Sequence, residues 1–132
     1  MLIKRTVQTS SREQFIDITD VIREVLQEMD LQNGVVTVFV PHTTAGVTIN
    51  ENADPSVVHD MLYALDKAVP DDRHFRHAEG NSTAHVKSSV IGPSLQVIVE
   101  KGRLVLGTWQ GIYFCEFDGP RTRSLLIKGL SG

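Results

Sequence analysis

The run Val35–Val40 (Val-Val-Thr-Val-Phe-Val) places the strongest constraint on how this chain can fold. Its residues are mostly β-branched, which favours a strand, and it lacks the polar alternation of a half-exposed strand. We therefore expect a central strand that is buried on both faces. A chain of 132 residues is long enough to bury one such core. The sequence is expected to form one domain, residues 1–132.

Two helices are predicted on either side of this strand in the sequence. Apolar residues recur at helical spacing over 19–29, with Thr19 or Asp20 as the N-cap, and again over 55–68. Asp54 before a proline is typical of an N-cap with proline at the first helical position. A third, short helix is expected after residue 81.

The rest of the chain is expected to be mostly strand. Glycine and proline separate the extended segments as turns. The predicted strands span residues 2–9, 14–17, 47–50, 94–99, 103–106, 111–117 and 123–130. The expected fold class is α+β, a single compact domain with a mainly antiparallel β-sheet or sandwich and two main helices.

Composition excludes some classes of binding partner. The formal net charge of −3 argues against a general nucleic-acid binder, which needs a basic surface. No segment approaches the roughly twenty apolar residues of a membrane span. Residues 1–10 do not resemble a signal peptide, and the single cysteine, Cys115, is interpreted as strand filler that forms no intrachain disulfide. We expect a cytoplasmic protein with neither nucleic-acid nor membrane partners.

Residues 77–89 hold the densest polar chemistry in the chain. His77 and His85 are eight residues apart, on either side of Gly80, so a chain reversal would aim both imidazoles at one ion. The spacing matches no compact metal motif. A hydrogen-bonded polar network without metal is the alternative.

Two other segments carry candidate site residues. His42 follows the strand 35–40, where it is either held at a cleft or is a turn histidine whose threonine neighbours satisfy the backbone. Trp109 lies between two glycines and is either a platform for a planar heterocycle or a core residue. The turn ending at Arg121 aims a guanidinium that can bind phosphate with two hydrogen bonds.

Together these segments resemble the YjbQ family of small cytosolic proteins. The resemblance spans nearly the whole chain and implies a compact α+β homotrimer with a site near the subunit boundaries. The motifs that carry it are Pro41-His-Thr-Thr-Ala-Gly46 with Asn50-Glu51, Glu79-Gly-Asn-Ser82 with Ala84-His85 and Lys87-Ser-Ser89, Gly102, Leu106-Gly-Thr-Trp-Gln-Gly-Ile-Tyr113, and Phe117-Asp-Gly-Pro-Arg121.

The same resemblance implies a thiamine-phosphate synthase, which joins a hydroxymethylpyrimidine diphosphate to a thiazole phosphate and releases pyrophosphate. On this hypothesis a small phosphorylated substrate is the partner, and a divalent metal ion, Mg or Zn, is the cofactor. Two alternatives stay open, namely a metal-dependent hydrolase and a non-catalytic binder of a small phosphorylated ligand.

Each candidate residue then has an expected role. Positive charge from Lys87, Arg121 and the metal would stabilise the departing pyrophosphate. The catalytic candidates are His42, Glu79, His85 and Lys87. The metal candidates are His42, His77 and His85. The substrate-binding candidates are Thr43, Asn81, Ser82, Ser88, Trp109, Gln110, Asp118 and Arg121.

Overall fold

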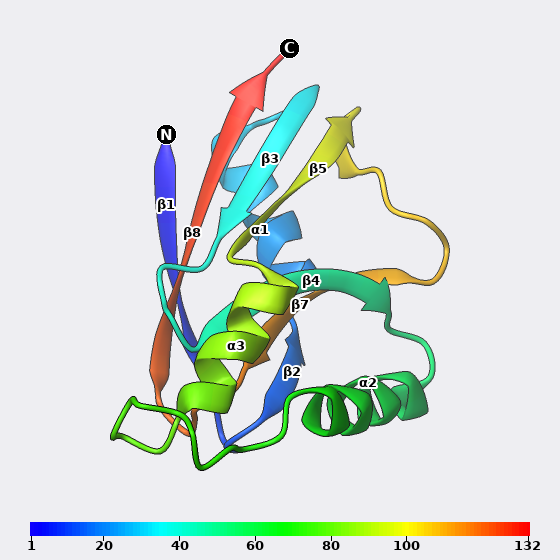
Figure 1. Ribbon diagram of the computed structural model, residues 1–132. Helices are drawn as coiled ribbons and strands as arrows, with labels where there is room; N and C mark the ends of the chain where they lie inside the picture. The colour runs from blue at the N-terminus through cyan, green and yellow to red at the C-terminus, as the bar shows by residue number, and fades with distance from the viewer.

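A computed structural model describes all residues, 1–132, and confirms the α+β class with antiparallel sheets (Figure 1). It contains eight strands and three helices. In chain order these are β1 Leu2–Gln8, β2 Gln14–Asp17, α1 Thr19–Met29, β3 Gly34–Phe39, β4 Ala45–Glu51, α2 Pro55–Ala68, α3 Ser82–Ile91, β5 Ser94–Glu100, β6 Arg103–Leu104, β7 Gln110–Glu116 and β8 Thr122–Ser131.

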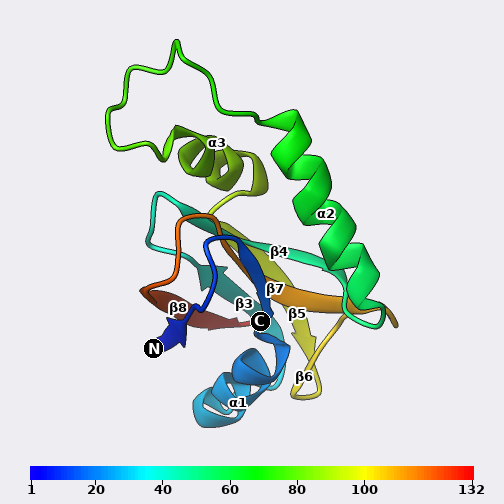
Figure 2. The same cartoon turned by 90° about the horizontal axis from the view of Figure 1, so that it is seen from below.

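The strands form two antiparallel sheets around a main apolar core. The larger sheet has the order β1-β8-β3-β5-β6 and the smaller one β2-β7-β4. α1 lies on one side of the sheets, while α2 and α3 lie on the other (Figure 2). The core takes residues from both sheets and from α1, including Val36, Leu125, Phe114 and Ile22, each fully buried. Burial of this apolar surface is the main force that holds the two sheets together.

β7 serves two cores because successive side chains of a strand point to opposite faces. Ile112 and Phe114 belong to the main core, whereas Tyr113 and Cys115 belong to a smaller cluster beneath α2 and α3. Burial raises the pKa of the Cys115 thiol. The thiol is therefore protonated and inert at neutral pH, as expected of strand filler.

The helix starts follow local side-chain chemistry. Asp54 is the N-cap of α2, as predicted, and accepts a hydrogen bond of 2.9 Å from the backbone N–H of Ser56. The prediction for α1 is wrong by one or two residues. Its N-cap is Ile18, and the carboxylate of Asp17 accepts the Thr19 N–H instead, at 2.9 Å.

β3 is the middle strand of the larger sheet, but the prediction that both its faces are buried is wrong. Val36 and Val38 face the core and are fully buried, whereas Phe39 is 41 % exposed on the outer face. The reason is that α2 and α3 cover the smaller sheet, so no helix covers this outer face (Figure 2). None of the three helices is long and apolar enough to cross a membrane.

Candidate active site

His42 lies in the turn between β3 and β4, where a backbone amide fixes its ring. The N–H of Ser124 on β8 donates a hydrogen bond to His42 Nε2 at 2.9 Å. Partial burial and the nearby positive charge of Arg123 lower the pKa of His42. His42 is therefore a neutral imidazole at neutral pH, held in one orientation.

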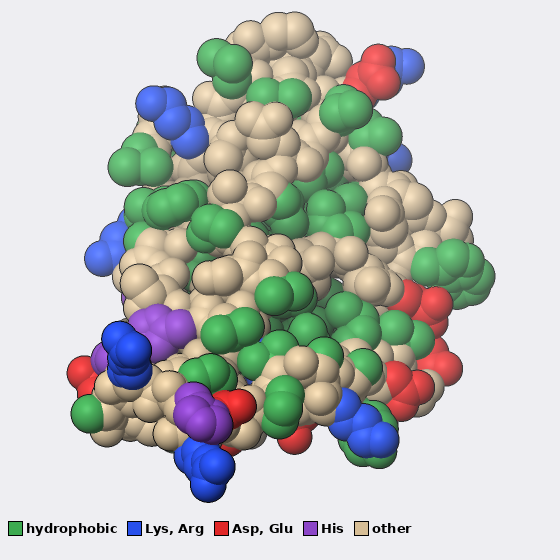
Figure 3. All heavy atoms as spheres, in the orientation of Figure 1, with side chains coloured by type: hydrophobic (Ala, Val, Ile, Leu, Met, Phe, Trp, Pro, Cys, Tyr) green, Lys and Arg blue, Asp and Glu red, His purple; other side chains and the backbone are tan.

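A cavity of about 320 Å³ opens beside His42 and is shared with α3. Ser88 on α3 donates a 2.5 Å hydrogen bond to the carbonyl of Thr43, which ties the helix to the turn. In Figure 3, histidine side chains lie beside positively charged side chains at the lower left of the molecule, where Figure 1 draws the loop that leads into α3. The lining contains two histidines and three hydroxyl groups but no carboxylate: His42, Thr43, Ala45, His85, Ser88, Ser89 and Pro93.

His85 also contacts His77, the other histidine of the polar stretch. Their ring centroids are 5.2 Å apart in an edge-on arrangement. His77 Nε2 lies 3.9 Å from a carboxylate oxygen of Glu79, and His77 and Ser82 line a separate shallow hollow with His85. The structure thus brings His85 next to both other candidate histidines, without bringing all three to one cavity.

The donor set does not fit the predicted three-histidine metal site. No group of three or more His, Cys, Asp or Glu side chains is arranged to hold a metal ion. A neutral imidazole has one nitrogen lone pair, and in His42 the Ser124 amide occupies it at Nε2. His42 is therefore unfit as a metal ligand while this hydrogen bond exists.

Arg121, Asp118 and Asn81 meet at the start of α3. Arg121 Nη2 lies 3.0 Å from Asp118 Oδ2, and Asn81 Nδ2 donates to the same oxygen at 2.9 Å. The positive charge of Arg121 makes a minor contribution to the lowered pKa of His42, but Arg121 does not line the cavity beside that ring. Arg121 is half exposed, so its remaining donors are free to reach an anion.

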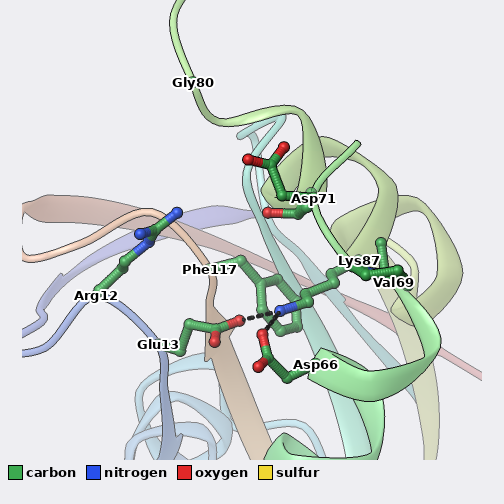
Figure 4. A pocket seen from close by; sticks show the side chains of 10 residues that line it. Arg12, Glu13, Asp66, Val69, Asp71, Gly80, Lys87 and Phe117 are labelled. Atoms are coloured by element: carbon green, nitrogen blue, oxygen red, sulfur yellow. Dashed lines mark hydrogen bonds and ion pairs between the residues drawn. The ribbon is translucent and has the colours of Figure 1, made fainter. Parts of the chain in front are cut away.

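Lys87 lies in a different cavity, of about 400 Å³, on the other side of α3 (Figure 4). Its ammonium is 2.7 Å from Glu13 and 3.0 Å from Asp66, and its side chain is only 3 % exposed. Burial acts to lower the pKa of Lys87, but the hydrogen bonds to both carboxylates outweigh it and raise the pKa. Lys87 is two helical positions after His85, and such residues do not share a face. The predicted pairing of these two side chains in one site is therefore not seen.

Trp109 and Gln110 are also remote from His42. Gln110 begins β7, while Glu116 at its other end pairs with Ala45 next to the His42 turn. The six residue-to-residue steps from Gln110 to Glu116 put the two ends about 20 Å apart. Trp109 is 62 % exposed, so it is not the core residue that the sequence also allowed.

The sequence patterns predict no role for a buried ion pair that lies beneath the His42 turn. Glu116 and Arg123 are 0 % and 3 % exposed, and Arg123 Nε donates to Glu116 at 2.9 Å. Thr9 donates to Glu116 at 2.8 Å, and the Asp118 N–H donates to it at 3.1 Å. The one signal that pointed to this network was a charged residue, Glu116, inside the apolar run 112–117.

Comparison with known proteins identifies relatives that match this chain over nearly its whole length. A family model described as "UPF0047 protein YjbQ-like" matches residues 3–132. The chain is 55% identical over 129 residues to the UPF0047 protein YugU of Bacillus subtilis, covering 97% of this chain and 98% of that protein. It is 50% identical over 128 residues to the UPF0047 protein MJ1081 of Methanocaldococcus jannaschii, covering 97% and 93%.

Solved structures share the fold. The crystal structure of an uncharacterized conserved YjbQ/UPF0047 family protein from Clostridium acetobutylicum has a TM-score of 0.94 and 52% identity, covering 97% of this chain and 99% of that chain. A hypothetical protein from Aeropyrum pernix, APE1520, has a TM-score of 0.94 at 36% identity, covering 100% and 99%. Fold and sequence therefore agree over nearly the full length.

Proposed function

The chain belongs to the UPF0047 family of YjbQ-like proteins, and we propose that it binds a phosphate-bearing substrate in the cavity between His42 and His85. We further propose that the reaction is the thiamine-phosphate synthase reaction that the sequence resemblance implies. In that reaction a new bond joins the thiazole phosphate to the pyrimidine methylene carbon, while the bond from that carbon to the diphosphate oxygen breaks and pyrophosphate leaves.

One observation carries the proposal: the cavity is lined by hydrogen-bond donors and contains no carboxylate. The rings of His42 and His85 and the hydroxyl groups of Thr43 and Ser89 are all able to donate to phosphate oxygens. A carboxylate in the lining would repel such a ligand, and none is present. The cavity is thus suited to an anion.

Arg121 supplies the charge that the histidines lack. Its guanidinium is half exposed, and after two hydrogen bonds to Asp118 it keeps further N–H groups that can reach an anion at the mouth of the cavity. Hydrogen bonds from a cation stabilise the negative charge that builds up on a departing pyrophosphate. Lys87 has no part in this proposal, because two carboxylates neutralise it in another cavity.

A metal-dependent hydrolase is the second function that the sequence allows. The 5.2 Å separation of the His77 and His85 rings is the observation that favours it, since the two imidazoles are close neighbours. Elemental analysis of the purified protein tests this prediction. A metal-free protein with full activity would exclude it.

We also propose that the protein is a homotrimer, as the resemblance implies. The outer face of the larger sheet carries Val35 beside Ile98 and Leu130, which are its partners on the two neighbouring strands. Ile98 and Leu130 are 60 % and 70 % exposed in the single chain. A second copy that covers this face would bury the apolar row.

Purified protein tests the activity directly. It is incubated with the pyrimidine diphosphate and the thiazole phosphate, and both pyrophosphate and thiamine phosphate are measured. We expect His85→Ala and Arg121→Ala each to lower kcat/KM by about 100-fold, as loss of one charge-stabilising donor does. His59→Ala is the matched control, because this histidine is exposed on α2, where it pairs with Asp60. Equal losses in His59→Ala and His85→Ala would contradict the assignment of the site.

A further inference from the structure

The hydrogen bond at His42 determines which ring nitrogen carries the proton. Ser124 N–H donates to Nε2, so Nε2 is unprotonated and the proton of the neutral ring is on Nδ1. Nδ1 makes no hydrogen bond within the chain. The only buried side-chain polar atom without a partner is Asn81 Oδ1, so His42 Nδ1 is open to solvent. His42 therefore offers one free N–H donor.

Arg123 anchors both ends of this hydrogen bond. It precedes Ser124, whose amide is the donor, and its Nη2 donates to Thr44 at 2.8 Å to the hydroxyl and 3.2 Å to the carbonyl. Thr44 is two residues after His42, the acceptor. One guanidinium thus holds β8 and the His42 turn at a fixed separation.

Glu116 in turn holds Arg123. Its carboxylate accepts Arg123 Nε at both oxygens, at 2.9 Å and 3.1 Å, and also accepts a further bond from Arg123 Nη2. Neither side chain lines the cavity beside His42. Any effect of the pair on a ligand must therefore act through the residues that it positions.

We propose that the buried Glu116–Arg123 pair positions His42 with Nε2 on the Ser124 amide, so that His42 presents Nδ1–H as a hydrogen-bond donor to an anionic ligand. This inference rests on the anion site of the proposed function, and it defines what that site recognises. The ligand must offer an acceptor oxygen to His42, as phosphate does. A cation or a hydrogen-bond donor at the same position would be rejected.

Nitrogen-15 NMR of the histidine side chains tests the tautomer without any knowledge of the substrate. In the free wild-type protein at neutral pH, we expect His42 to show a protonated Nδ1 and an unprotonated Nε2. We expect Glu116→Gln and Arg123→Lys to convert this signal to a mixture of tautomers. Val36→Ala is the control, because it weakens the core of β3 without touching the network.

The outcomes separate the inference from the proposed function. A protonated Nε2 in the wild-type protein, or an unchanged tautomer in both variants, would overturn the positioning role. The tautomer of His42 in the wild-type protein is measured without ligand, so this test can be made even where Glu116→Gln fails to fold. Inorganic pyrophosphate is then added to the wild-type protein, and we expect it to shift the signals of His42 and His85. If His42 has the expected tautomer but pyrophosphate shifts neither signal, the anion site is refuted and the positioning role remains.

Discussion

An ion pair inside an apolar sandwich is costly unless every polar atom has a partner. In the pair of Glu116 and Arg123, both carboxylate oxygens and two of the three guanidinium nitrogens have partners, because Thr9, Thr44 and the Asp118 amide add to the bonds within the pair. The network joins three turns that are far apart in the sequence. At the residue scale, one buried carboxylate thus fixes the positions of several candidate site residues.

Glu116→Gln tests this at the level of stability. Burial acts to raise the pKa of Glu116, but hydrogen bonds from Arg123 and Thr9 outweigh it and lower the pKa. Removing the charge leaves Arg123 buried without its counter-ion, so we expect the free energy of unfolding at neutral pH to fall by about 3 kcal/mol. Urea denaturation measures this difference.

The difference in the free energy of unfolding between the wild type and Glu116→Gln should depend on pH. A carboxylate with a lowered native pKa stabilises the fold above its unfolded pKa, about 4.3 for glutamate, and loses that contribution as the pH falls through the native pKa. The gap between wild type and Glu116→Gln should therefore narrow below pH of about 4. A gap that stays constant or widens in acid would show that the charge of Glu116 does not stabilise the fold.

At the scale of the elements, the predictions succeeded where the signal was local. β2 and α2 span the predicted residues, and α1 starts only one or two residues earlier than predicted, because apolar spacing and the Asp54 cap act within a few residues. The placement of Lys87 was not predictable in the same way. Its partners Glu13 and Asp66 are 74 and 21 residues away, and no local pattern reveals such a pairing.

Only helix geometry indicated in advance that Lys87 and His85 do not lie in one site. Once α3 is accepted as a helix, His85 and Lys87 must point to different sides. The partners of Glu116 were equally unpredictable from local sequence, because they depend on which segments lie beside β7 in the fold. Local propensity thus predicts the elements and the candidate residues, while the assembly of the site depends on contacts between distant segments.

Lys87 joins α3 to α2, which has no fully buried residue of its own. We expect Lys87→Met to leave Glu13 and Asp66 facing each other without the cation. Amide hydrogen exchange in α2 should then become about tenfold faster, equivalent to about 1.4 kcal/mol of local stability. Lys67→Met is the control, since Lys67 lies on the same helix with its ammonium over the ring of Tyr63 and forms no ion pair with a carboxylate. Similar exchange in both variants would mean that Lys87 does not fasten α2.

At the scale of the whole molecule, the two sheets differ in how they are covered. The smaller sheet lies between the main core and the layer of α2 and α3, whereas the larger sheet has one bare face (Figures 1 and 2). That face carries the apolar row of Val35, Ile98 and Leu130. A second copy of the chain would provide the missing layer, which is why the proposed homotrimer can be tested at this face.

Leu130→Lys places a charge in the apolar row. Leu130 is 70 % exposed, so the folded single chain should tolerate the change, whereas an interface would have to bury an unpaired ammonium. Light scattering after gel filtration should give about three times the chain mass of 14.6 kDa for the wild type and a mass near 14.6 kDa for the variant. Val90→Lys is the control, because Val90 is 64 % exposed but lies on α3. A wild-type protein of single-chain mass, or a Leu130→Lys variant that stays trimeric, would contradict assembly through this face.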